Sequence, residues 1–476
     1  MYFRMALSTF IFFLLAILFP LLIVKETGSF SFESNMALSW FIILYTSLKL
    51  SMLALSNLQR LLEITFWLFS YIWMGLTPLS HVMLDVYAWP GSYDDNTITF
   101  ALVIIVLGII SYEIGFLIAK SRYKLLSIPV HQNVNAIQMS VETIPKKWVY
   151  VVSIASLVMS VVIISKIGFS SIFQPRLVLD AIYSTAYSKT ELLIYSNLQK
   201  VPVFVALLFC LIIGKYKKNN SSKNPYLLLT AILFITNILI SNPISNARYW
   251  FGSVAIALCF IIFRWRKSSS ALWIISLVIL LLIVFPYSDV YRNSSAGTLV
   301  IQNMTKQLTE KGDYDAFQQL LNTIIYVKSN GLSYGYQLLG AVLFWLPRGI
   351  WPDKPYGTGQ TVAEALGYNF TNFSSPFWAE SYVNFGILGV IVMFALYGYV
   401  SYILQHKYIE SQRRKNSISV LQIIVPFLAA YQLFLLRGDL LNGMAYMSCF
   451  LLFSIVFFKG KRWSKAKKIE KIEVIR

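Results

Sequence analysis

Charged residues are scarce in this chain: they make up 13% of its 476 positions, while hydrophobic residues make up 57%. Soluble domains carry about 25% charged residues, so this composition excludes an ordinary soluble protein and indicates an integral membrane protein. The formal net charge of +19 would also suit nucleic acid. The basic residues, however, fall in short clusters between apolar runs, as membrane topology requires, and we expect no nucleic-acid partner.

Cysteine and histidine are also scarce, with three residues of each. The cysteines all lie inside apolar runs, so neither a disulfide framework nor a redox pair is predicted. The histidines, His81, His131 and His406, are far apart and lack the spacing of metal ligands, so no metal site is expected. No glycine-rich phosphate loop follows a strand pattern, which argues against ATP use. We therefore expect a protein without a cofactor.

Long apolar runs dominate the sequence and predict an all-α polytopic membrane protein with about twelve transmembrane helices. The runs are roughly 5–24, 37–55, 62–82, 97–119, 148–167, 194–214, 226–242, 249–263, 271–287, 379–404, 418–436 and 444–458. The first follows Arg4 and has no small-residue cleavage site, so it is interpreted as a retained signal anchor. The chain 1–476 is expected to form a single transmembrane domain.

Basic clusters mark alternate loops between these runs, which predicts that both termini are cytoplasmic. The C-terminal tail 459–476 is one such cluster, and its charge suits contact with anionic membrane lipid. Two loops on the opposite, outer face are long, 168–200 and 288–378. The second is too long for a bare connector, so it should contain structure of its own.

Two helices are predicted inside loop 288–378. Asp313-Tyr-Asp315 precedes an apolar stripe at helical spacing, and Asn330-Gly331 can end that helix. We expect this helix to lie flat on the membrane surface, with both aspartates as helix-start residues. The apolar run 338–346 is too short to cross a membrane, so it predicts an interfacial or re-entrant helix that brings Arg348 near headgroup depth.

Arginines recur on the predicted outer face, where the positive-inside tendency does not place them. They are Arg176, Arg248, Arg292, Arg348 and Arg437. The planar fork of an arginine binds phosphate oxygens in a bidentate manner, so such a cluster could hold a lipid pyrophosphate. The alternative is that each arginine pairs locally, for example Arg437 with Asp439.

Carboxylates on the same face could act as a general base, namely Asp289, Asp353, Glu380 and Asp439. Glu380 opens a long apolar helix, so its alternative role is to stabilise the helix dipole. Asp353 lies in a proline-rich turn and could serve only to shape it. The aromatic residues of this region could stack on sugar rings or form an interfacial belt: Trp345, Trp351, Tyr356, Phe377 and Trp378.

The stretch 344–359, FWLPRGIWPDKPYGTG, is the most distinctive motif of the chain. Here the sequence resembles the Wzy-type oligosaccharide repeat-unit polymerases, the O-antigen polymerases of bacterial envelopes. Further matching segments follow in order: 242–250, 286–292, 313–317, 379–389 and 436–440. Some members of that family show an arginine followed, after ten residues, by a glycine in two outer loops. Arg348 and Gly359 reproduce this spacing, and no other outer arginine does.

The resemblance implies a multi-pass glycosyltransferase of the bacterial inner membrane, active at its periplasmic face. It would transfer a growing polysaccharide chain from undecaprenyl pyrophosphate to the non-reducing end of a lipid-linked repeat unit, without a nucleotide sugar. Its partners would be the lipid-linked oligosaccharide, membrane lipid, a chain-length regulator and a flippase.

On this hypothesis Arg348 binds the pyrophosphate. The supporting substrate contacts would be Arg176, Arg248, Tyr249, Arg292, Trp351, Lys354 and Arg437. Glu380 or Asp439 would be the catalytic base.

Three other functions stay open at this point. A flippase typically shows pseudo-symmetric halves and polar groups at mid-membrane depth, and no internal repeat is visible here. A polysaccharide ligase shares the same leaving group, so the arginines do not exclude it. A membrane acyltransferase would need a catalytic histidine, for which His81 is the candidate near an outer helix end.

Overall fold

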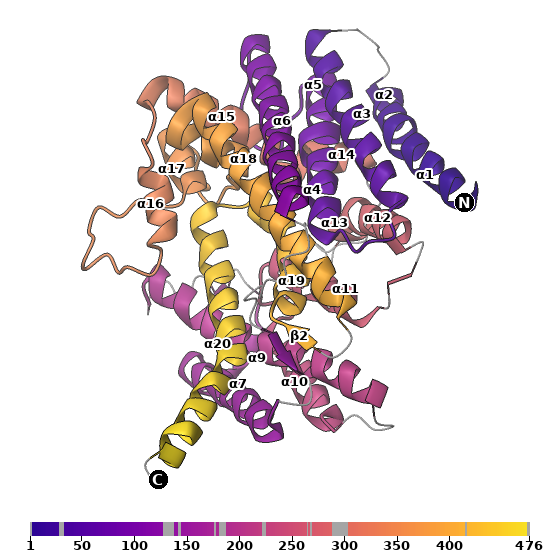
Figure 1. The fold of residues 1–476 in the computed structure, drawn as a ribbon. Helices are drawn as coiled ribbons and strands as arrows, with labels where there is room; N and C mark the ends of the chain where they lie inside the picture. Colours follow the sequence, from indigo (N-terminus) through magenta and orange to yellow (C-terminus); the bar gives the residue numbers. More distant parts are fainter. Residues whose placement is uncertain are drawn as a thin grey trace. The chain divides into compact units, whose positions relative to one another are not determined.

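The computed structural model describes residues 2–27, 33–126, 138–140, 144–175, 178–179, 187–220, 225–263, 265–266, 269–287, 303–414 and 417–473. These residues are almost entirely helical (Figure 1). One small antiparallel pair of strands, β1 (Gln138–Ser140) and β2 (Ser417–Ser419), sets Met139 opposite Ile418. The chain divides into two compact units, which are described separately.

Unit 1 consists of Met1–Ile128, Trp265–Gln405 and Gln432–Met444. Its N-terminal helices are α1 (Tyr2–Phe13), α2 (Phe19–Thr27), α3 (Ser34–Ala54), α4 (Leu61–Tyr71), α5 (Thr77–Leu84) and α6 (Asp95–Leu126). Short π-helical turns join α1 to α2 and α4 to α5. Helix α3 packs against α1, α4 and α6, and α12 (Ser269–Ile279) lies on it as well (Figure 1).

The next described elements of unit 1 are mostly short helices. They are α13 (Phe285–Tyr287), α14 (Met304–Glu310), a 3₁₀ turn (Gly312–Tyr314), α15 (Ala316–Asn330), α16 (Tyr336–Val342) and α17 (Thr358–Ala365). Helix α18 (Phe377–Arg413) then begins in unit 1. As predicted, α15 ends at Gly331, whose φ of 80° suits glycine.

Helix α18 is broken near its start. Phe385 has φ −142° and Gly386 has φ 62°, so the first two turns form a short half-helix that carries Glu380. Because the helix is interrupted here, the end of this half-helix can form hydrogen bonds with the turn before α16. Ser333 donates its N–H to the carbonyl of Val383 at 2.9 Å and its hydroxyl to Asn384 Oδ1 at 3.0 Å. Ser333 and Asn384, the two ends of this stretch of chain, therefore lie in contact at the end of the half-helix.

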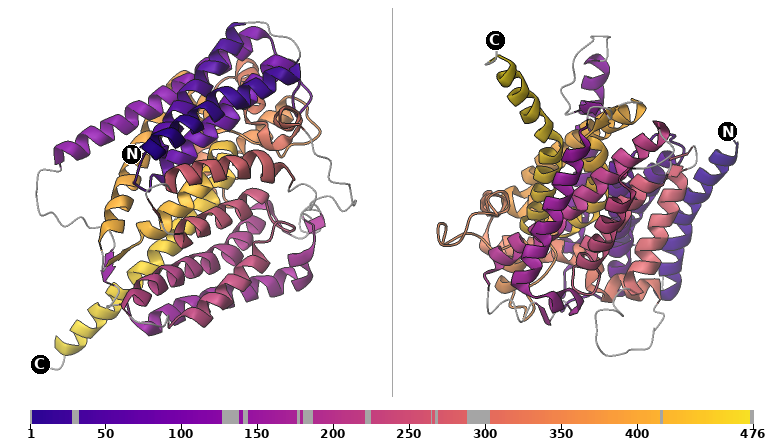
Figure 2. Two further views of the ribbon diagram at one scale, coloured as in Figure 1. Left: turned by 90° about the vertical axis from the view of Figure 1, so that its right-hand side faces the viewer. Right: turned by 90° about the horizontal axis from the view of Figure 1, so that it is seen from below.

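Unit 2 consists of Pro129–Arg264, His406–Tyr431 and Ala445–Arg476. It contains α7 (Lys146–Ile167), a 3₁₀ turn (Phe169–Phe173), α9 (Lys189–Asn220), α10 (Leu227–Ile240) and α11 (Arg248–Ile262). It also contains most of α19 (Leu421–Arg437) and α20 (Leu440–Glu473). Helix α9 packs against both α7 and α10 (Figure 2). Its residues from Val201 to Cys210 are buried.

Among the described residues, seven helices are long and apolar enough to cross a membrane. They are Tyr2–Glu26, Ser34–Ala54, Asp95–Tyr123, Lys146–Ile167, Glu191–Tyr216, Phe377–Arg413 and Leu440–Phe458. This confirms the prediction of an all-α membrane protein. The other predicted segments are also helical, but they are shorter or interrupted by a π turn. The number of twelve spans and the topology stay predictions.

Candidate functional site

The motif loop, residues 343–357, carries most of the motif 344–359 and joins α16 to α17 in unit 1. It folds on itself through tight turns. The N–H of Ile350 donates to the carbonyl of Pro347 at 3.0 Å, and that of Lys354 to Trp351 at 3.2 Å. Lys354 is buried, and its Nζ donates to the carbonyls of Phe344 at 2.5 Å and Leu346 at 3.0 Å. Predicted as a substrate contact, Lys354 instead closes the loop, and burial beside the Arg348 charge lowers its pKa.

Arg348 is the half-buried cation of this loop. Its guanidinium lies 4.0 Å from the centre of the Tyr356 ring. It donates long hydrogen bonds to the carbonyls of Pro352 at 3.3 Å and Pro355 at 3.4 Å. Within the described ranges, neither Arg348 nor Lys354 forms an ion pair. A cation that binds only neutral groups keeps its capacity for a strong, charge-assisted bond to an anion.

The loop ends in Gly357-Thr358-Gly359, which touches two buried carboxyl groups. The Thr358 hydroxyl donates to Glu380 Oε2 at 2.8 Å, and the Gly359 N–H donates to Asp439 Oδ2 at 3.3 Å. A Cβ added at Gly357 would lie 2.0 Å from Asp439 Oδ2. Glycine is therefore required here by the close approach of the carboxylate to the backbone.

Three helix N-termini converge on these two carboxyls. Glu380 lies in the first turn of α18 and accepts the Leu440 N–H at 3.1 Å. Asp439 caps α20, because its Oδ1 accepts the N–H of Leu441 at 2.9 Å and of Asn442 at 3.4 Å. The third N-terminus is that of α17, whose second residue, Gly359, donates its N–H to Asp439. Burial raises the pKa of Asp439, and its three amide bonds oppose that rise.

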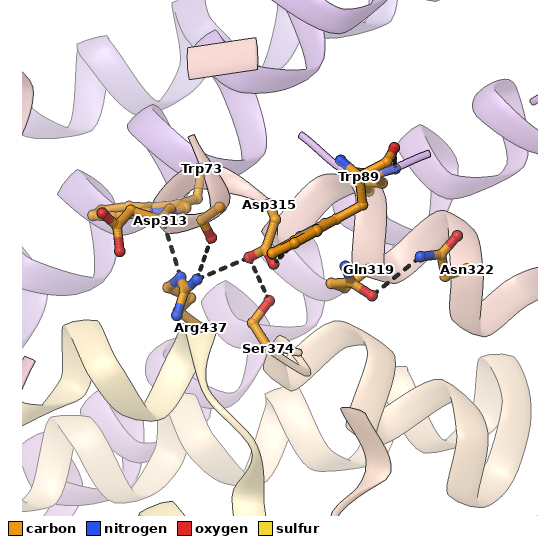
Figure 3. A network of polar contacts seen from close by, with 10 residues as sticks. Trp73, Trp89, Asp313, Asp315, Gln319, Asn322, Ser374 and Arg437 are labelled. Carbon is orange, nitrogen blue, oxygen red and sulfur yellow. Dashed lines mark hydrogen bonds and ion pairs between the residues drawn. The ribbon is translucent and has the colours of Figure 1, made fainter. Parts of the chain in front are cut away.

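Arg437 is held in a second polar network (Figure 3). Its Nη2 forms an ion pair with Asp315 Oδ1 at 2.9 Å, and its Nε donates to the Asp313 carbonyl at 2.9 Å. Asp315 also accepts the hydroxyl of Ser374 at 2.6 Å and the indole N–H of Trp89 at 2.9 Å. The sequence suggested Asp439 as the local partner of Arg437, whereas the ion pair of the structure uses Asp315.

Helix α15 forms where it was predicted, but its polar face is covered. Its first nine residues are all buried, including Gln318 and Asn322. Gln318 is hydrogen-bonded to both backbone groups of Trp89, at 3.0 and 2.6 Å. The Tyr93 hydroxyl donates to Asn322 Oδ1 at 2.6 Å. The loop before α6 thus covers the side of this half of α15 that was expected to face water. That α15 lies flat on the membrane surface stays a prediction.

The other predicted site residues are placed as follows. Trp351 is half-buried in the motif loop and meets the Tyr336 ring edge-on at 5.8 Å. Trp378 is fully buried and donates to the Ile105 carbonyl at 3.2 Å, so it belongs to the core. Arg248 and Tyr249 begin α11 in unit 2. Arg176, Asp289 and Arg292 lie outside the described residues.

Sequence reasoning missed three residues that the structure places beside the predicted ones, namely Trp89, Thr358 and Ser374, and it assigned Asp315 only to the start of a helix. Thr358 had a local signal, since it lies between the two glycines of the motif. Trp89 had none, because 226 residues separate it from Asp315.

Within the described part of the chain, no three histidine, cysteine, aspartate or glutamate side chains gather so that they could hold a metal ion. Comparisons of the chain with protein-family models, with curated proteins and with solved structures found no match. The resemblance to the Wzy-type polymerases therefore stays a prediction from the motifs.

Proposed function

We propose that this protein is a membrane glycosyltransferase that polymerises lipid-linked oligosaccharide repeat units. One observation carries the proposal. The loop that bears Arg348 is joined, through Thr358 and Gly359, directly to the buried carboxyl groups of Glu380 and Asp439. One loop thus carries a candidate anion-binding group and contacts both candidate acid–base groups, the two kinds of group that transfer from a pyrophosphate requires.

The departure of the pyrophosphate needs stabilisation of negative charge. In the proposed step, an acceptor hydroxyl oxygen bonds to the anomeric carbon while the bond from that carbon to the pyrophosphate oxygen breaks. The pyrophosphate leaves with the electron pair. Arg348 stabilises it, because its guanidinium is held in place by the loop carbonyls and Tyr356 while no acid within the described ranges neutralises it.

The proton of the acceptor hydroxyl needs a base, and we assign this role to Glu380. Asp439 accepts three amide N–H groups and caps α20, which commits it to holding helices together. Glu380 accepts the Leu440 N–H, but its other oxygen accepts the Thr358 hydroxyl, a group that can exchange protons with an acceptor hydroxyl. Asp439 then serves as a positioning residue rather than the base.

The setting of this reaction is also proposed. The alternating basic loops support about twelve spans with both termini in the cytoplasm. In that arrangement the Arg348 loop faces the periplasm of a bacterial inner membrane. The donor is then undecaprenyl pyrophosphate carrying the growing chain, and the acceptor is the next lipid-linked repeat unit. A flippase and a chain-length regulator are the proposed partners.

The test is the envelope glycan profile of a strain that lacks this gene, resolved by gel. Lipid core with one repeat unit and no ladder is expected, because polymerisation alone is lost. Core without any repeat would instead indicate a flippase or a ligase. Complementation with Glu380→Gln should leave the single-repeat profile at normal protein level, and a full ladder would remove Glu380 as the base. Arg414→Ala, which opens an exposed ion pair with Glu410, is the matched control and should restore the ladder.

A further inference from the structure

Asp315 joins three segments that are far apart in the chain. Its carboxyl is bound by Arg437 at the end of α19, by Ser374 ahead of α18, and by Trp89 ahead of α6 (Figure 3). Its side chain is 2% exposed, and that of Arg437 is 13% exposed. Asp315 is thus a buried carboxylate with a directed donor from each segment.

Two of these segments lead straight to the candidate site. Ser374 lies six residues before Glu380, and the first turn of α18 fills most of that interval. Arg437 lies two residues before Asp439, with Gly438 between them. A change at Asp315 is therefore passed through very short stretches of chain to both carboxyls. Displacements of about 1 Å at a reacting group are known to cost about a hundredfold in rate.

Stability alone does not account for an ionic group in this place. A buried ion pair gains little stability over a well-packed apolar pair, because both charges lose their hydration. What it adds is direction, since the charged donor and the hydroxyl each bond to Oδ1 and the indole N–H bonds to Oδ2. An apolar contact would allow the same segments to slide.

We propose that Asp315 is a positioning residue that sets the placement of Glu380 and Asp439. The proposal rests on the proposed function, in which Glu380 is the base. Asp315 does not touch substrate; it acts through Ser374 and Arg437. Its loss should lower kcat for repeat-unit transfer and leave KM for the lipid-linked acceptor almost unchanged, because the Arg348 loop keeps its own contacts.

The experiment compares Asp315→Asn with Tyr93→Phe in the full-length protein reconstituted in nanodiscs. Asn keeps an acceptor for one donor but loses the charge that holds Arg437. Tyr93→Phe removes two bonds of the same polar region, one donated to Asn322 and one accepted from Gln318, and touches neither Ser374 nor Arg437. We expect Asp315→Asn to lower kcat about tenfold to a hundredfold, and Tyr93→Phe to change it less than about twofold. Equal kcat values in the two variants would overturn the proposal.

A second readout does not depend on activity. Hydrogen exchange of a peptide that starts ahead of Arg437 and includes Leu440 and Leu441 reports the amides held by Glu380 and Asp439. These amides should exchange faster in Asp315→Asn than in Tyr93→Phe, and unchanged exchange would contradict the positioning role. If Asp315→Asn does not fold, Ser374→Ala takes its place in both measurements, because it removes only the hydrogen bond from Ser374 to Asp315. If Arg348→Ala retains full transfer, the proposed function fails, whatever the exchange data show.

Discussion

Two arginines of the same unit, Arg348 and Arg437, meet very different surroundings. Arg437 is saturated by a buried carboxylate and by backbone carbonyls. Arg348 is half-buried and rests on long bonds to its own loop and on one tyrosine ring. The sequence offered both as ligands for a pyrophosphate. The difference teaches that the partner of an arginine, rather than its place at a helix end, separates a group that holds the fold from one that can bind a ligand.

Arg437→Ala should have the largest effect, because it leaves the Asp315 carboxylate buried without its cation. We expect the free energy of unfolding to fall by about 3–5 kcal/mol. Thermal unfolding of the detergent-solubilised protein measures this. Arg414→Ala, at an exposed pair, should stay within about 1 kcal/mol. A similar small change for Arg437→Ala would erase the distinction between the two arginines.

Arg348→Ala should show the opposite pattern. We expect transfer of repeat units to fall about a hundredfold to a thousandfold, because one preplaced donor to the leaving group is lost. The unfolding temperature should change little, since Arg348 holds the loop only by long hydrogen bonds and by its contact with the Tyr356 ring. Arg348→Lys keeps the charge but not the planar fork of donors, so its activity should lie between that of the parent protein and that of Arg348→Ala. A normal ladder with Arg348→Ala would contradict the proposal.

Gly357→Ala tests the junction between the motif loop and Asp439. The new Cβ would overlap Asp439 Oδ2, so the contact must open. We expect a loss of about 1–3 kcal/mol in the free energy of unfolding. Gly349→Ala, in the same loop, meets nothing within 4 Å and should change stability by less than about 0.5 kcal/mol. Equal melting temperatures in both variants would show that the junction is loose.

Asp439→Asn should change how stability depends on pH, with the smallest effect. Burial raises the pKa of Asp439, so the folded protein holds this proton more tightly than the unfolded chain does. The stabilisation is complete below the usual aspartate pKa and is lost as pH rises through the raised value. Asp439→Asn should remove up to about 1.4 kcal/mol per pH unit of that slope. An unchanged slope in Asp439→Asn would contradict the prediction.

Local patterns were sufficient to predict the helices of this fold. The apolar stripe that starts at Phe317 and the Asn330-Gly331 stop gave α15 and its end correctly, because helical period and a glycine cap act over neighbouring residues. The same pattern gave no sign of what covers the polar face of α15. That depends on Trp89 and Tyr93, which join the helix from more than two hundred residues away.

The candidate site could be predicted in part for the same reason. Arg348 and Glu380 stood out by charge at the ends of apolar runs, and the motif glycines lay beside them. Lys354 and Arg437 carried the same signal, yet the structure uses them to hold backbone carbonyls and Asp315. Charge and spacing alone do not tell these uses apart. The pairing partner does, and 122 residues separate Arg437 from Asp315.

The break in α18 has a consequence for how such proteins can diversify. Because Ser333 meets Val383 and Asn384, the chain between them departs from the helical scaffold and returns to the same place. Not every part of this excursion can change length freely, because Gly359 is bonded to Asp439 and Ser374 to Asp315, both outside it. The loop from Leu343 to Tyr356 lies ahead of both bonds, so insertions or deletions there need not disturb the registers of the helices outside the excursion.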